Sequence, residues 1–173
     1  DWSIENAYAM ALVERQLGVR GSYYLLHPDA RITQKNYFGR VEDGQLVIDP
    51  KRFDWAARLL DLGHEVGLHN DLITLALATR RQPGEFLEQI VEAFTRRGMP
   101  LVGSVAHGSR KCREHGYMNY QIFEELQQVH VAVDYQDSTE LFDRFHEPQV
   151  EVDGYVVPKF KLRMADYGLR YEA

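Results

Sequence analysis

Three histidines and two aspartates lie at positions where a parallel α/β sheet usually carries its catalytic or metal-binding residues. Four of them each end a predicted strand: His27, His69, His107 and Asp134. The fifth, Asp1, comes just before the first predicted helix. Because the carboxyl ends of parallel strands meet at one edge of a sheet, these side chains can converge there. Neutral imidazoles with a carboxylate suit Zn²⁺ or a similar divalent ion that keeps open positions for water.

The segment from Gly63 to Asp71, Gly-His-Glu-Val-Gly-Leu-His-Asn-Asp, is the centre of this arrangement. It has the character of a short buried strand between two helical patterns. Successive side chains of a strand point to opposite faces, so His64 and His69 are predicted to point apart. His69, at the strand's end, is the predicted metal ligand. His64 is either a hydrogen-bonded core residue or a catalytic group that supports the site.

Two further polar residues have two interpretations each. Asp71 is a catalytic candidate because it follows His69, and it equally fits the N-cap of the next helix. His107 precedes Gly108 and Ser109, where a ligand can approach the backbone closely. His107 is therefore either a ligand or a structural residue.

Helices and strands alternate over the first two thirds of the chain, and the last third is richer in β-structure. Apolar periodicity and capping residues predict helices over 3–18, 50–63, 71–80, 83–98 and 120–128. Buried strands are predicted over 21–26, 64–69, 101–106 and 131–133, hairpins over 37–48 and 150–157, and a half-exposed strand over 159–164. Right-handed crossovers make the early strands parallel, which defines a single α/β domain over residues 1–173.

Composition excludes several classes of function. The 173 residues carry a formal charge of −6 and no stripe of basic residues, so a nucleic-acid partner is not expected. No apolar run reaches membrane-spanning length. Cys112 is the single cysteine, which rules out an internal disulfide. The chain begins at Asp1 without a methionine, so we expect a fragment of a longer polypeptide. The expected location is the cytoplasm.

One alternative assigns residues 64–69 to a helix. His64-Glu65 followed by His69 is similar to the helical His-Glu-x-x-His pattern of metallopeptidases. The second histidine comes one residue late, however, and Val-Gly-Leu between them is typical of a strand.

The same segment resembles the polysaccharide deacetylase family, also called the nodulation-protein-B homology domain. In that family a Gly-His-Glu-Ile/Val-Gly segment leads into a metal-binding histidine, here Gly63 to His69. Asp1-Trp2 resembles the end of the family's first motif, Val105-Ala-His107-Gly-Ser resembles a His-Gly-Ser segment of related proteins, and residues 7–26 resemble its helix and second strand. The resemblance covers roughly residues 1–135.

The resemblance implies a distorted (β/α) barrel with fewer than eight complete units. It also implies a divalent metal, most simply Zn²⁺, held by one aspartate and two histidines. Metal-bound water then attacks an N-acetyl or related amide or ester carbonyl of a carbohydrate. Carried onto this chain, Asp1 and His69 correspond to two of the ligands.

The chain departs from the family pattern at the third ligand. Ile73 stands four residues after His69, where the family has its second metal histidine, and Ile73 cannot bind a metal. His107 is therefore expected as the third ligand, with Asp71 as a substitute, while Asp71 and His64 are the catalytic candidates. The alternative is a member of the same fold that binds a carbohydrate or a partner without catalysis.

Overall fold

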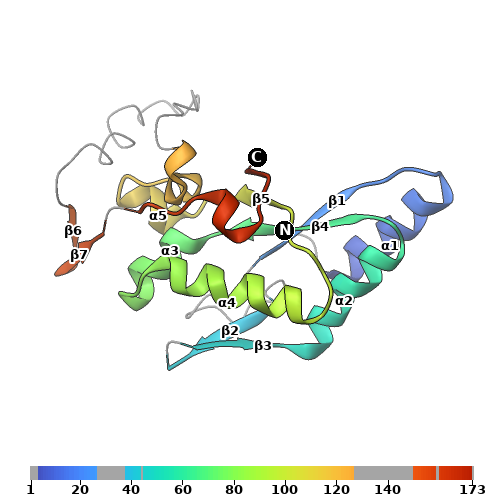
Figure 1. Ribbon diagram of the computed structural model, residues 1–173, viewed down its shortest axis with the longest axis horizontal. Helices are drawn as coiled ribbons and strands as arrows, with labels where there is room; N and C mark the ends of the chain where they lie inside the picture. Colours follow the sequence, from blue (N-terminus) through green and yellow to red (C-terminus); the bar gives the residue numbers. More distant parts are fainter. Residues whose placement is uncertain (1–3, 27–37, 44, 127–149, 159, 173) are drawn as a thin grey trace.

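The computed structural model describes residues 4–26, 38–43, 45–126, 150–158 and 160–172 (Figure 1). Within them the helices are α1 (Ile4–Gln16), α2 (Pro50–Asp61), α3 (Leu72–Thr79), α4 (Pro83–Arg96) and α5 (Arg110–Glu114). The strands are β1 (Ser22–Leu26), β2 (Gly39–Glu42), β3 (Gln45–Ile48), β4 (Glu65–Asn70), β5 (Gly103–Ala106), β6 (Val150–Val152), β7 (Tyr155–Val157) and β8 (Tyr171–Glu172). No helix in these ranges is long and apolar enough to cross a membrane.

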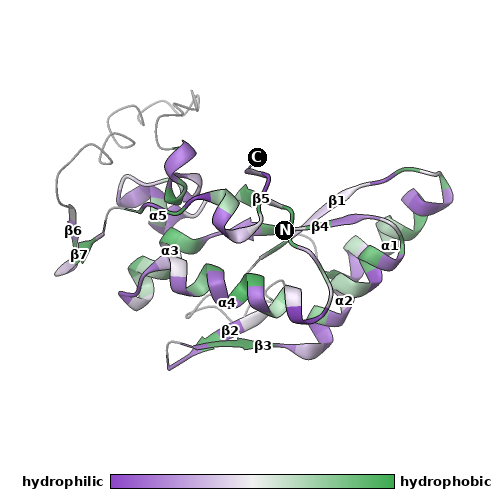
Figure 2. Ribbon diagram, in the orientation of Figure 1, coloured by the Kyte–Doolittle hydropathy of each residue, from purple (hydrophilic) through white to green (hydrophobic). Residues whose placement is uncertain are grey.

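A four-stranded parallel sheet in the order β1-β4-β5-β8 is the centre of the α/β fold. Helices α1 and α2 pack against each other at the β1 end, and α2 also contacts β4 (Figure 1). Helices α3 and α4 pack against each other, and α4 contacts the antiparallel β2–β3 hairpin. Figure 2 shows hydrophobic and hydrophilic residues alternating along α2 and α4, as in helices that cover a core with one face.

Local sequence signals set the ends of α2. The side chain of Asp49 accepts hydrogen bonds from the backbone of Lys51 at 3.0 Å and of Arg52 at 3.3 Å, and Pro50 fills the first turn. Gly63 then takes a positive φ of 87° after the helix. The chain can therefore turn directly from α2 into β4.

The two faces of the sheet differ in composition. Val66 and Leu68 of β4 are buried at 1% and 0% exposure and belong to the hydrophobic core. On the opposite face of β4 lie Glu65, Gly67 and His69, of which Glu65 and His69 are only half-buried. The sequence prediction that His64 and His69 belong to opposite faces agrees with this alternation.

Most predicted elements up to residue 106 are confirmed, as are both hairpins. The hairpin turn at Asp153-Gly154 has positive φ at both residues, 50° and 74°, which suits the twist of two short antiparallel strands. Helix α5 and strand β8 were not predicted. The predicted strand at 131–133 lies outside the described residues.

Two predictions after residue 118 are wrong. The segment predicted as a helix over 120–128 forms two 3₁₀ turns, η1 (Asn119–Ile122) and η2 (Glu124–Leu126). The predicted strand over 159–164 forms only an isolated bridge between Leu162 and Phe123, followed by the 3₁₀ turn η4 (Met164–Tyr167). Phe160 is buried, as expected for the apolar face of the predicted strand. The backbone of Leu162 forms hydrogen bonds with Ile122 and Glu124, and among the described residues this pairing does not extend into a strand.

Gly67 is required by the packing of the half-buried face. A Cβ at residue 67 would lie 2.6 Å from Cδ1 of Tyr24 and 2.9 Å from the carbonyl oxygen of Gly103. We expect Gly67→Ala to lower the free energy of unfolding by about 1–3 kcal/mol, the usual cost of overpacking, in urea denaturation. Gly108→Ala is the matched control, because nothing lies within 4 Å of the added Cβ. Equal stabilities of the two variants would contradict this account.

Candidate functional site

His69 and His107 meet at the carboxyl edge of the sheet. His69 is the fifth residue of β4, and His107 follows β5 directly, where its backbone N–H donates to the carbonyl of Asn70 at 2.7 Å. Nδ1 of His107 lies 3.3 Å from Nε2 of His69, and the rings cross at 76° with centroids 4.7 Å apart. Both side chains are half-buried. Two residues 38 positions apart in the chain are thus joined because β4 and β5 are neighbouring parallel strands.

The spacing of these two nitrogens fits a shared metal ion. Two imidazole nitrogens bound to one tetrahedral Zn²⁺ at 2.0–2.1 Å would lie about 3.3 Å apart. Binding would displace the proton that the two rings share in the hydrogen bond. Among the described residues no third His, Cys, Asp or Glu joins them in a group that could hold a metal. The predicted ligand Asp1, and the candidates His27 and Asp134, lie outside the described residues.

Asp71 is a buried residue at the start of α3. It occupies the N-cap position of α3, but its side chain makes no capping hydrogen bond. The side chain of Asn70 does this instead, accepting from the backbone of Leu72 at 3.1 Å. Asp71, 4% exposed, accepts a hydrogen bond at Oδ1 from Asn119 at 2.8 Å. The predicted N-cap position of Asp71 is confirmed, but its side chain does not cap the helix and instead accepts from Asn119.

Asn119 connects Asp71 to the His107 loop and was not found from the sequence. Its Nδ2 donates to Oδ1 of Asp71 and to the carbonyl oxygen of His107, both at 2.8 Å. Its Oδ1 accepts from the backbone of Ile73 at 3.0 Å, and its own carbonyl accepts from Asn70 at 3.1 Å. A fully buried amide with every donor used holds its neighbours in fixed positions. No local motif marks Asn119 in the sequence, because Asp71 lies 48 positions away in the chain.

Glu172 lies beside Asn70 and Ser104 on the core face of the sheet. Nδ2 of Asn70 is 3.4 Å from Oε1 of Glu172, and Ser104 is the residue that pairs with Glu172 between β5 and β8. Burial raises the pKa of Glu172 to about 7, and the hydrogen bond from Asn70 opposes the increase. A carboxyl group that holds its proton near neutrality thus adjoins the network around Asn119.

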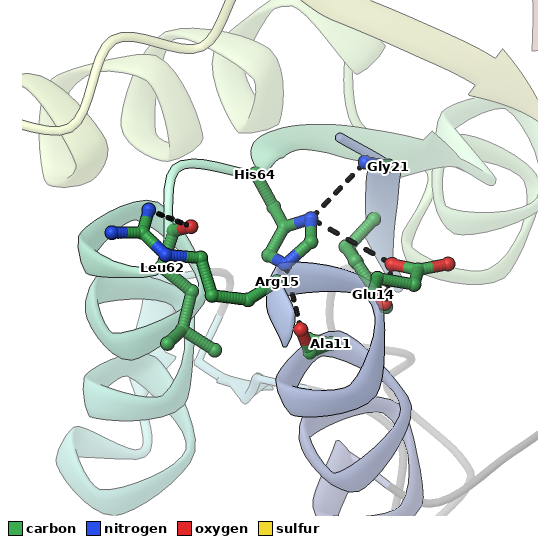
Figure 3. A network of polar contacts seen from close by, with 7 residues as sticks. Ala11, Glu14, Arg15, Gly21, Leu62 and His64 are labelled. Atoms are coloured by element: carbon green, nitrogen blue, oxygen red, sulfur yellow. Dashed lines mark hydrogen bonds and ion pairs between the residues drawn. The ribbon is translucent and has the colours of Figure 1, made fainter. Parts of the chain in front are cut away.

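The structure does not bring His64 to this edge. His64 precedes β4, at the opposite end of the strand from His69, and is 2% exposed. Figure 3 shows both ring nitrogens engaged: Nδ1 accepts from the backbone of Gly21 at 3.0 Å, and Nε2 donates to the carbonyl of Ala11 at 2.9 Å. Glu14 lies 3.6 Å from Nδ1. These contacts connect α1 and the residue before β1 to the start of β4. Of the two roles predicted for His64, they correspond to that of a hydrogen-bonded core residue.

Comparison of the chain with protein-family models, curated proteins and solved structures found no match.

The free energy of unfolding is expected to depend on pH through the ionisation of Glu172. Its pKa is about 7 in the fold against 4.5 ordinarily, so between these values the folded chain keeps a proton that the unfolded chain releases. Stability is therefore highest below pH 4.5 for this group and falls as pH rises to 7. At about 1.4 kcal/mol per pKa unit, the loss of free energy of unfolding is at most about 3.5 kcal/mol.

Urea denaturation between pH 4.5 and 8 measures this dependence in the wild type and in Glu172→Gln. The amide keeps an acceptor for Asn70 but cannot ionise, so the variant is expected to lose this part of the slope. Glu151→Gln, an exposed change in β6, is the control and should keep it. A slope unchanged in Glu172→Gln would show that another group titrates.

Proposed function

We propose that the chain is a metal-dependent hydrolase of the deacetylase type, removing an N-acetyl or related amide or ester group from a carbohydrate. The observation that carries this proposal is the pair of imidazole nitrogens 3.3 Å apart at the carboxyl edge of a parallel sheet. This edge is where α/β folds place catalytic residues. The resemblance of the segment from Gly63 to His69 to the deacetylase motif supports the choice of reaction.

In this proposal His69 and His107 hold a divalent ion, Zn²⁺ first, together with Asp1 as the expected third ligand. When bound, the ion supplies Lewis acidity towards a carbonyl oxygen and lowers the pKa of water. Asp71 acts as the proton acceptor, because it is a buried carboxylate that Asn119 fixes against the His107 loop. His64 keeps a structural role, since both of its nitrogens are used within the core.

The finer fold in this proposal is a distorted (β/α) barrel. Parallel strands joined through helices are the units from which a (β/α) barrel is built. The tyrosines of β1 and β8 support this, because their hydroxyls meet across two intervening strands, 2.9 Å apart. The metallopeptidase alternative is not retained, because residues 65–70 form strand β4 and not the helix it needs.

Metal binding tests the site directly. Elemental analysis after incubation with Zn²⁺ and desalting should find about one equivalent in the wild type. His69→Ala and His107→Ala should each lower the affinity by more than about 100-fold, because each removes a ligand whereas loss of a supporting residue costs 10–100-fold. His64→Ala should lower stability but keep the metal, and His115→Ala, in the loop after α5, is the control.

Equal metal loss in His64→Ala and His69→Ala, with both variants folded by circular dichroism, would contradict the proposed site. Acetate release from N-acetylated oligosaccharides then separates the two classes of function. A chain that binds metal and sugar without releasing acetate belongs to the non-catalytic alternative.

A further inference from the structure

Two tyrosines and a glutamate form a hydrogen-bonded cluster on the same face of the sheet as His69. Tyr24 comes from β1, Glu65 from β4 and Tyr171 from β8. The hydroxyl oxygens of Tyr24 and Tyr171 are 2.9 Å apart, and the hydroxyl of Tyr171 donates a short hydrogen bond to Oε1 of Glu65. All three residues are half-buried, so the cluster is neither part of the packed core nor free on the surface.

A row of residues across the sheet makes room for this cluster. The strand registers align Tyr24 with Gly67, and Gly103 with Tyr171, while Gly67 and Gly103 are neighbours on β4 and β5. A Cβ at Gly67 would collide with the ring of Tyr24, and one at Gly103 would collide with the ring of Tyr171. The two rings therefore lie over the two glycines, and this brings their hydroxyls together above the middle of the sheet.

The cluster lies on the same face of the sheet as the candidate metal ligands, nearer the amino ends of the strands. On β4 the row of Gly67 is roughly 7 Å from His69, and Glu65, which accepts from Tyr171, is roughly 13 Å from His69. A disaccharide is long enough to span this range. A molecule that reached His69 and His107 with one group could contact the cluster with the next.

The directions of the hydrogen bonds define what the cluster can bind. Tyr171 has one hydroxyl proton, which it donates to Glu65, so its oxygen must accept the proton of Tyr24. Burial and the hydrogen bonds to Glu65 and Tyr24 raise the pKa of Tyr171, so it keeps its proton. The groups left for a ligand are acceptor lone pairs on Tyr24 and Glu65. Among the described residues no cation forms an ion pair with Glu65.

We propose that Tyr24 and Glu65, held in place by Tyr171, bind the hydroxyl groups of the sugar whose amide lies at His69 and His107, and so select neutral, hydroxyl-rich sugars over carboxylated ones. This inference rests on the proposed function for the position of the amide. Sugar hydroxyls donate to the free acceptors of the cluster. A carboxylate on the ligand would meet the negative charge of Glu65 without a cation between them, which disfavours it.

Two sugars test this selection on the full chain incubated with Zn²⁺. Calorimetric titration with N,N′-diacetylchitobiose, which is neutral, is compared with N-acetylneuraminic acid, which carries a carboxylate. The wild type should prefer the neutral sugar. Tyr24→Phe keeps the ring over Gly67 but removes the oxygen, and should weaken binding of the neutral sugar about five- to tenfold, as for one net hydrogen bond.

Glu65→Gln provides a second, independent readout. The amide oxygen can still accept from Tyr171, so the cluster stays joined, but the negative charge is lost. The ratio of the affinity for the neutral sugar to the affinity for the carboxylated sugar should fall by about tenfold, the effect expected when a charged hydrogen-bonding group becomes neutral. Tyr8→Phe, in a half-buried tyrosine of α1 that packs on Trp55, is the matched control and should leave both affinities unchanged.

Metal content, measured on the same samples, separates failure of this inference from failure of the proposed function. Unchanged sugar binding in both Tyr24→Phe and Glu65→Gln, with zinc retained, overturns the assignment of the cluster and leaves the metal site standing. Absence of zinc in the wild type overturns the proposed function, and the titrations still decide the role of the cluster. A wild type that binds neither sugar, or that prefers the carboxylated one, also overturns the assignment.

Discussion

The pairing of β4 with β1 on one side and β5 on the other is the constraint on which the rest of the structure depends. This pairing places His69 beside His107, because both strands end at the same edge. It also places Gly67 between Tyr24 and Gly103, so that the half-buried face has room for two tyrosine rings. On the other face the same strand contributes Val66 and Leu68 to the core beneath the helices.

The two ends of β4 show how partners decide the role of a histidine. His64 and His69 are of the same residue type, five positions apart. His64 meets a backbone N–H and a backbone carbonyl that satisfy both nitrogens within a buried site. His69 contacts the imidazole of His107 at the carboxyl edge of the sheet. A metal ion bound by both rings would replace the hydrogen bond between them. The candidate site therefore lies at one end of the strand, and the hydrogen bonds that support the core lie at the other.

The sequence predicted those parts in which local signals and tertiary contacts agree. Alternation along 64–69 gave the strand and its faces, and the turn residues gave both hairpins. The segment after residue 118 was mispredicted because its backbone bonds go to Leu162, a partner that periodicity cannot reveal. Asn119 was missed for the same reason, since its role comes from contacts with Asp71 and His107. Tyr171 and Glu172 form a strand too short to show any period.

The shortness of β8 has a consequence for how the two faces move. Among the described residues two pairs, Gly103 with Tyr171 and Ser104 with Glu172, join it to β5, and the backbone N–H of Arg170 donates to the carbonyl of Val102 just before them. Tyr171 projects to the half-buried face and Glu172 to the core face, so one local opening of β8 would release both contacts together. A molecule that binds Tyr171 would then slow amide hydrogen exchange in β8, including at Glu172, which that molecule does not contact. The two faces are thereby thermodynamically linked through a single two-residue strand.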